Sequence, residues 1–155
     1  MAIPQQIKAY LNGLKIPYEV IHHRRDFTAQ ETARDTHTPG RDFAKTIVLY
    51  ADNDYYMMVL PATYKLDLQK IKTALGWRYV DLATEEELAQ VCADCEVGAM
   101  PPLGRLYNMK VFVDRHLTED HLITFNAGTH EDVIRLRYDD FNMLSNPNVI
   151  DIARS

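Results

Sequence analysis

The fold is organised around one predicted β-hairpin, KTIVLYADNDYYMMVLPA, which spans residues 45–62. Its two arms, 45–51 and 55–60, are rich in β-branched and aromatic residues, as strands generally are. Between the arms stand Asp52, Asn53 and Asp54, residue types that favour a tight turn. The apolar run from Tyr55 to Ala62 is closed by Pro61-Ala62 and is far shorter than the roughly 18 residues of a membrane span, so it predicts a buried strand.

Upstream of the hairpin, the pattern predicts two helices and a short strand. Apolar residues at positions 3, 7, 11 and 14 recur on one helical face, so we expect a helix over residues 3–14. A strand is expected at 18–21. Thr28 and Glu31 have the spacing of a capping box, which predicts that a second helix starts at Thr28 and ends before Thr38-Pro39-Gly40.

Downstream of the hairpin, helices and strands continue to alternate. Asp67 predicts the start of a helix that Gly76 ends, and Thr84 and Glu87 form a second capping box. Further strands are predicted at 79–82, 110–114, 122–126, 133–137 and 149–152, with a short helix at 138–144. This mixture predicts an α/β fold, a single domain over residues 1–155 with a mixed sheet and surrounding helices.

Composition narrows the function classes. The chain is 46% hydrophobic and has a net charge of −5, which argues against a protein that coats nucleic acid, so we expect no DNA partner. Met1 to Gln6 lack the charged and apolar regions of a signal peptide, and no apolar stretch is long enough to cross a membrane. We therefore expect a cytoplasmic protein with no membrane partner.

The two cysteines stand as Cys92-Ala93-Asp94-Cys95. This C-x-x-C spacing is compatible with half a zinc site or a redox pair, but a structural zinc site needs four ligands and no second cluster is present. A thioredoxin-like pair should follow a strand and open a helix, whereas this pair falls late in a predicted helix. We therefore predict two partly buried structural thiols.

Standard catalytic signatures are missing: there is no G-x-S-x-G, H-E-x-x-H or P-loop, and the six histidines show no chelating spacing. Lys45 is notable because it opens a buried strand directly after a Pro-Gly loop. There are two interpretations of this lysine. Either its aliphatic stem is buried and its ammonium reaches solvent, or the ammonium is a fixed cation at the mouth of a pocket, suited to a phosphate or an oxyanion.

Two loops offer further candidates. Gly98 to Pro102 form either a rigid connector or a loop that presents backbone groups in a fixed geometry. Asn126 to His130 form either a plain hairpin turn or a turn that directs a histidine into a pocket, where it binds substrate or narrows the cavity.

Taken in order, these segments resemble the YbaK/ProX family, which is similar to the editing domain inserted in bacterial prolyl-tRNA synthetases. The resemblance covers nearly the whole chain. Its motifs are Thr28-Ala29-x-Glu31, Lys45-Thr46, Val59-Leu60-Pro61-Ala62, the helix containing Thr84 to Glu87, Gly98-x-x-x-Pro102 and Asn126-Ala127-Gly128.

The resemblance implies one α/β domain with a strongly curved mixed sheet that hydrolyses the ester between an amino acid and the 3′-terminal adenosine of tRNA. No metal or organic cofactor is expected. Lys45 would be the catalytic cation, anchoring phosphate and stabilising developing charge, and the ribose 2′-hydroxyl would assist the proton transfers. The substrate-binding candidates are Thr46, Gly98, Ala99, Met100, Pro101, Pro102, Gly128 and His130, with His130 setting the size of the amino-acid pocket.

The expected reaction is trans-editing of tRNA for proline, with alanine or a similar small aliphatic residue favoured, cysteine next, and serine or threonine after it. The partners implied are the tRNA acceptor end and a prolyl-tRNA synthetase. Arg41, Lys45, Lys65 and Arg105 are candidates for a local basic patch. The alternative is a non-catalytic module of the same fold that binds tRNA or a synthetase.

Overall fold

The central hairpin consists of β2 (Ala44–Ala51) and β3 (Asp54–Pro61), paired in antiparallel register over their whole length. Asp52 and Asn53 form its turn with φ angles of 43° and 72°. Two consecutive positive φ angles match the right-handed twist of the flanking strands, and Asp and Asn tolerate them better than most residues. This hairpin prediction is confirmed in the computed structural model, which describes residues 2–155.

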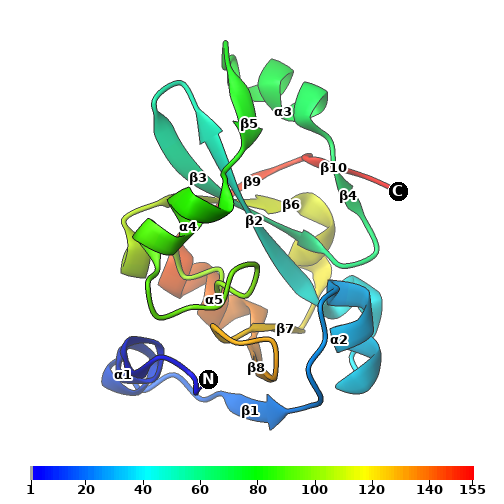
Figure 1. The fold of residues 1–155 in the computed structure, drawn as a ribbon. Coiled ribbons are helices and arrows are strands. Elements are labelled where there is room, and N and C mark those ends of the chain that lie inside the picture. The colour runs from blue at the N-terminus through cyan, green and yellow to red at the C-terminus, as the bar shows by residue number, and fades with distance from the viewer. Residues whose placement is uncertain (1) are drawn as a thin grey trace.

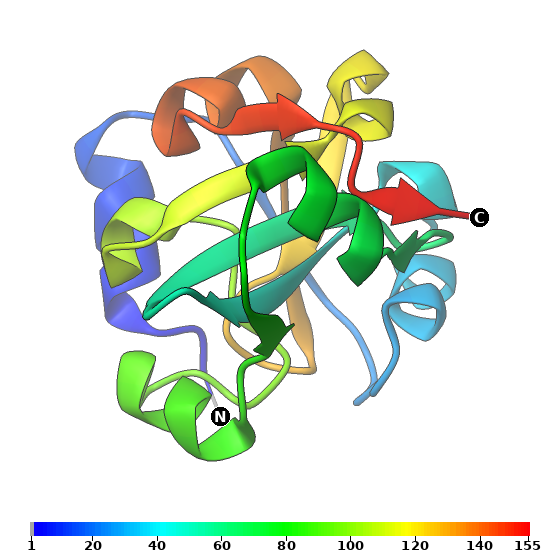
Figure 2. The ribbon, with the colours of Figure 1, turned by 90° about the horizontal axis from the view of Figure 1, so that it is seen from above.

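Five strands form the main sheet in the order β5-β2-β3-β6-β9 (Figure 1). Strand β5 (Val80–Leu82) is antiparallel to β2, while β6 (Lys110–Asp114) and β9 (Asn148–Ile150) extend the other side in parallel. Figure 2, viewed from above, shows β6 beside β9 near the C-terminus. The sheet is therefore mixed, and the predicted α/β class is confirmed.

A second, antiparallel sheet has the order β1-β8-β7, with β1 (Glu19–His22), β8 (Asp132–Arg137) and β7 (Leu122–Asn126). An isolated bridge between Phe43 and Thr124 joins it to the beginning of β2. In Figure 1 this sheet lies below the central hairpin. Two short strands, β4 (Lys65–Leu66) and β10 (Ala153–Arg154), pair separately and are absent from the sequence-based prediction.

The helices are α1 (Gln5–Gly13), α2 (Ala29–Asp35), α3 (Leu68–Leu75), α4 (Glu85–Val91) and α5 (Tyr138–Ser145), with 3₁₀ turns η1 (Gly40–Asp42), η2 (Gly104–Tyr107) and η3 (Arg115–Glu119). Both predicted capping boxes are confirmed, because Thr28 and Thr84 each accept a hydrogen bond from the backbone of the glutamate three residues later. Gly76 ends α3 with a φ of 67°. None of these helices, within the part of the chain described, has the length and apolar character to span a membrane.

The larger core lies between the two sheets, where Ile7 and Leu11 of α1 pack with Phe125, Ile134 and Phe141. A smaller core lies under α3 on the other face of the main sheet and contains Leu49, Met58, Ile71, Phe112 and Ile152. The predicted apolar face of α1 is wrong at its end. Leu14 is 51% exposed, because α1 ends at Gly13 and Leu14 no longer follows the buried stripe.

Candidate functional site

A gap along the free edge of β2 defines the candidate site. Strand β5 pairs with β2 only from Leu49 onward, and Ala83 extends this contact by donating to the Val48 carbonyl at 3.0 Å. On the same edge, β7 meets the chain at Phe43. The stretch between them, residues 45–47, is left uncovered and borders two adjoining cavities.

We call the first cavity the polar compartment. Its volume is about 250 Å³, and its lining is Phe27, Thr28, Ala29, Thr32, Lys45, Thr46, Ile47, Gly98, Asn126 and His130. The second, the apolar compartment, has a volume of about 200 Å³ and is lined by Thr46, Ile47, Val48, Leu82, Ala83, Leu88, Gly98 and Met100. Three residues, Thr46, Ile47 and Gly98, border both, so one ligand can occupy the two together.

Lys45 lines the polar compartment with a half-buried side chain. Within residues 2–155 its ammonium has no hydrogen-bond or ion-pair partner. Burial lowers the pKa of Lys45 from its ordinary value, and the nearby Lys65 ammonium lowers it further. The cavity therefore contains an unneutralised cation that is a stronger proton donor than an exposed lysine.

The loop from Glu96 to Pro102 lies beside Lys45 and is tied to the turn after β7. Glu96 N–H donates to the Gly128 carbonyl at 2.8 Å, and Gly128 N–H donates to the Ala99 carbonyl at 2.8 Å. Gly98 has a φ of +83°, a backbone angle that residues other than glycine rarely adopt. Arg25 pairs with Glu96 and holds the pKa of that carboxyl below its usual range. The loop is thus fixed from two sides.

Not every predicted loop residue reaches a cavity. Gly98 and Met100 line the compartments, whereas Ala99, Pro101 and Pro102 are buried and line neither of them. The Pro102 carbonyl accepts a hydrogen bond from Ser145 Oγ at 2.8 Å, which anchors the loop on α5. Ala99 and Pro102 thus hold the loop in place through their carbonyl groups.

Gly128 also lines neither compartment and acts on the site only through the Gly98 loop. Its φ is +88°, and a Cβ at this position would lie 2.6 Å from Cδ of Pro4. The residue therefore faces the start of α1, and its contribution to the site is the pair of backbone hydrogen bonds that hold the Gly98 loop.

His130 closes one side of the polar compartment. Its Nε2 lies 2.7 Å from the Val97 carbonyl, and its ring centroid lies 5.8 Å from that of Phe27. A Cβ on Gly98 would lie 3.6 Å from His130 Cε1, so ring and loop are in direct contact. The ring thus narrows the cavity and is held in place by the loop.

Sequence reasoning missed several lining residues. Phe27 is 73% exposed at the rim, although its neighbours are fixed: Asp26 N–H donates to the His130 carbonyl and the Arg25 guanidinium lies 5.6 Å from the Phe27 ring centroid. Asn126 stood in a recognised motif but was not assigned to the site. Both lie far in sequence from Lys45. The available signals were the position of Phe27 next to the Thr28 capping box and the place of Asn126 at the start of its motif.

Of the four residues expected to form a basic patch, Lys45 and Lys65 are close enough for one charge to affect the other. Arg41 lines a different cavity of about 420 Å³ together with three carboxylates, those of Asp42, Glu119 and Asp120. Arg105 lies exposed on η2, which packs on α5 and β6.

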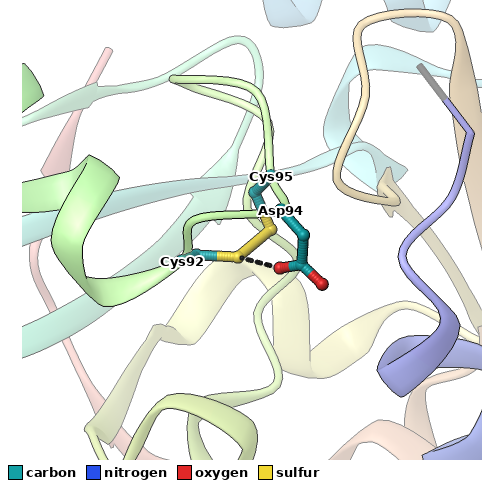
Figure 3. A group of neighbouring side chains, drawn as sticks. All are labelled: Cys92, Asp94 and Cys95. Carbon is teal, nitrogen blue, oxygen red and sulfur yellow. Dashed lines mark hydrogen bonds between the residues drawn. A yellow bond between two sulfur atoms is a disulfide. The ribbon is translucent and has the colours of Figure 1, made fainter.

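The prediction that Cys92 and Cys95 are separate thiols is wrong, because a disulfide joins them (Figure 3). Helix α4 ends at Val91 rather than continuing through both cysteines. The chain turns at once, with Cys95 N–H donating to the Cys92 carbonyl at 3.3 Å, so the two Cα atoms are 5.4 Å apart and within reach of a disulfide. Asp94 Oδ1 lies 3.3 Å from the Cys92 sulfur. In this form neither sulfur is the thiolate that binds a metal.

The fold and the site together define a class of protein. Its members are mixed α/β domains in which a lysine without an ion-pair partner among the described residues lies in a cavity beside the loop from Gly98 to Pro102. The chain belongs to the aminoacyl-tRNA editing domain family, whose model matches residues 23–144.

Curated relatives include two proline–tRNA ligases. The ligase of Staphylococcus epidermidis is 25% identical over 128 residues, a match that covers 76% of this chain and 22% of the ligase. The ligase of Streptococcus pneumoniae is 30% identical over 89 residues, covering 57% of this chain and 14% of the ligase. This chain therefore spans a small part of the curated relatives it matches.

Solved structures confirm the fold over nearly the whole chain. The crystal structure of a candidate trans-editing enzyme for prolyl tRNA synthetase superposes with a TM-score of 0.82 at 19% identity, covering 99% of this chain and 100% of that one. The structure of a hypothetical protein, APE2540, gives a TM-score of 0.84 at 18% identity over 97% of this chain.

Proposed function

We propose that this chain is an aminoacyl-tRNA deacylase that acts in trans, with residues 1–155 as one cytoplasmic editing unit. Its substrate is tRNA, with proline tRNA carrying a wrong, small amino acid as the favoured species. The observation behind this proposal is the pair of adjoining compartments, one polar with an unpaired cation and one apolar. The end of an aminoacyl-tRNA has a matching polar part and apolar part, because the charged ribose-phosphate of the terminal adenosine lies next to the side chain of the attached amino acid.

The reaction needs little beyond positioning and charge. Water adds to the ester carbonyl carbon, the bond to the ribose 3′-oxygen breaks, and the products are the free amino acid and tRNA with a free 3′-hydroxyl. Lys45 stabilises the negative charge on the carbonyl oxygen or the neighbouring phosphate, and the backbone of the Gly98 loop orients the acyl group. Because an aminoacyl ester is already activated, the substrate 2′-hydroxyl can assist the proton transfers without a protein triad.

The apolar compartment supports the choice of substrate. Apart from Thr46, where the two compartments join, the lining side chains are apolar, among them Leu82, Ala83 and Leu88. Alanine and similar aliphatic residues are therefore favoured over serine and threonine, with cysteine next. Since discrimination of one methylene is worth only about 1–3 kcal/mol, a synthetase for proline benefits from a second enzyme that removes smaller residues. A prolyl-tRNA synthetase is the proposed partner. With a net charge of −5, we expect weak and salt-sensitive tRNA binding.

The test is deacylation of proline tRNA charged separately with alanine, cysteine, serine, 2-aminobutyrate and proline. We expect rapid loss of one small residue, little loss of proline, and near-complete inactivity of Lys45→Ala. Lys110→Ala, which removes an exposed lysine from β6, is the matched control and should retain activity. Hydrolysis of none of the five above the spontaneous rate would overturn the proposal and favour a non-catalytic binding module.

A further inference from the structure

The polar side chains of the polar compartment divide into those with partners and those without. Thr28 Oγ1 is used in the capping box with Glu31, and Thr32 Oγ1 donates to the Thr28 carbonyl at 3.1 Å. His130 Nε2 is engaged by the Val97 carbonyl. The lining groups that remain free to meet a ligand, within the residues described, are Lys45, Thr46 and Asn126.

Two of these free groups are buried oxygens. Thr46 Oγ1 and Asn126 Oδ1 have almost no solvent-accessible area and no hydrogen-bond partner in the described chain. Leaving such an atom unpaired costs about 1–3 kcal/mol, so native proteins pair nearly all of them. Both atoms belong to residues that line one cavity, Thr46 on β2 and Asn126 at the end of β7. Because both oxygens are closed to solvent, a ligand group in the cavity reaches them only when the Thr46 or Asn126 side chain rotates toward it, and their lack of partners indicates such a ligand group.

The polarity of the free groups identifies that ligand group. Lys45 is a pure donor, so it takes the acceptors of the substrate, its carbonyl or phosphate oxygens. Asn126 Oδ1 is an acceptor and Thr46 Oγ1 accepts as well as donates, so together they can accept from a donor of the substrate. An aminoacyl ester has two donors near its carbonyl, the α-amino group and the ribose 2′-hydroxyl. The proposed reaction uses the hydroxyl in proton transfer, which leaves the α-amino group. Asp and Glu are absent from the lining described, so neutral oxygens are the available acceptors.

We propose that Asn126 Oδ1 and Thr46 Oγ1 bind the α-amino group of the amino acid, and that the site thereby selects aminoacyl over simple acyl esters. This inference rests on the proposed function and assigns Asn126 a substrate-binding role. Thr46 lies where the two compartments join, so an α-amino group held there directs the side chain into the apolar compartment and the ester toward Lys45.

A binding cycle tests this inference without requiring catalysis. The probes are 3′-alanylamido- and 3′-propionylamido-3′-deoxyadenosine, two stable amides that differ only in the α-amino group. We expect the wild type to bind the alanyl probe about tenfold more tightly or better, a ratio appropriate to one satisfied buried polar contact. Asn126→Leu and Thr46→Val, which remove the polar atoms at similar volume, should reduce that ratio toward one. Thr46→Ser, which keeps the hydroxyl, should largely restore it.

The outcomes separate this inference from the proposed function. Equal binding of both probes by the wild type, an unchanged ratio in Asn126→Leu, or no binding of either probe would overturn the α-amino contact. A parallel loss of both probes with a lowered melting temperature would also overturn it, because that pattern belongs to a structural role. The deacylation assay is read independently: turnover of alanyl-tRNA with equal probe affinities retains the deacylase and rejects the contact.

Discussion

The two compartments share Thr46, Ile47 and Gly98 but are built differently. The polar compartment combines α2, β2, the Gly98 loop and the turn after β7, and its walls are held by hydrogen bonds such as that between His130 and Val97. The apolar compartment is closed mainly by β5 and α4, which follow one another in the chain. We infer that chemistry depends on the first and selection of the side chain on the second, so substitutions should separate the two effects.

The largest expected effect is in the polar compartment. Lys45→Met keeps an unbranched side chain and removes the charge, so kcat/KM should fall about 100-fold or more for every amino acid tested. Because the pKa of Lys45 is lowered and the cation is the active form, wild-type activity should decline as pH rises through that lowered pKa, earlier than an ordinary lysine would allow. Deacylation rates against pH, corrected for spontaneous hydrolysis, measure this. If Lys45→Met reduced the rate much more for some amino acids than for others, the polar compartment would also take part in selection, which contradicts the division proposed above.

The next effect is in the apolar compartment. Leu88→Trp adds volume on α4, so substrates larger than alanine should lose activity by about 10–100-fold while alanine loses less. Competition between alanyl- and 2-aminobutyryl-tRNA gives the ratio directly. Leu106→Trp, a substitution at a partly buried position on η2, is the control for nonspecific damage. A uniform loss across substrates in Leu88→Trp would contradict a selective role for this compartment.

His130 is an exception to this division, because it lines only the polar compartment but contacts the loop that both compartments share. His130→Ala widens the polar compartment and frees the Val97 carbonyl, so we expect the range of accepted amino acids to broaden by several-fold in kcat/KM. The same charged tRNAs measure it. An unchanged substrate profile would remove His130 from the selection of the amino acid.

Gly98→Ala tests the shared loop itself. Its φ of +83° should make the substitution cost about 1–2 kcal/mol, while the added Cβ meets His130 only at ordinary contact distance. Gly13→Ala is the matched control, since nothing lies within 4 Å of its Cβ, and it should leave stability equal or slightly improved. Urea unfolding measures both. Equal stability of the two variants would show that the loop does not need its left-handed residue.

The smallest expected effect compares the two capping boxes. Thr28→Ala and Thr84→Ala each remove one N-cap and should each reduce the free energy of unfolding by about 1 kcal/mol. Only Thr28 lines the polar compartment, so only Thr28→Ala should also change deacylation. Paired unfolding and activity measurements check this, and equal activities would mean that the start of α2 contributes stability alone.

The sequence predicted local structure well because its signals are local. The hairpin at 45–60, the capping boxes at Thr28 and Thr84 and the stop at Gly76 each depend on a few neighbouring residues, and all are confirmed. The predictions were wrong where the apolar pattern of a helix continued in the sequence beyond the point at which the chain leaves the helix. Leu14 and the cysteines were assigned to helices that end before them, and the turn after α4 instead brings Cys92 and Cys95 into a disulfide.

By itself, then, the sequence determined the α/β class, the starts and ends of most elements, and the residue types able to act, with Lys45 foremost. Only the tertiary structure decided which of them meet. Phe27, Lys45 and Asn126 come from separate parts of the chain and share a cavity because β7 and β5 leave the edge of β2 uncovered between them. The same packing turned Gly128 toward α1 and left buried oxygens of Thr46 and Asn126 without a hydrogen-bond partner among residues 2–155. Such contacts depend on long-range packing, for which a local pattern has no signal.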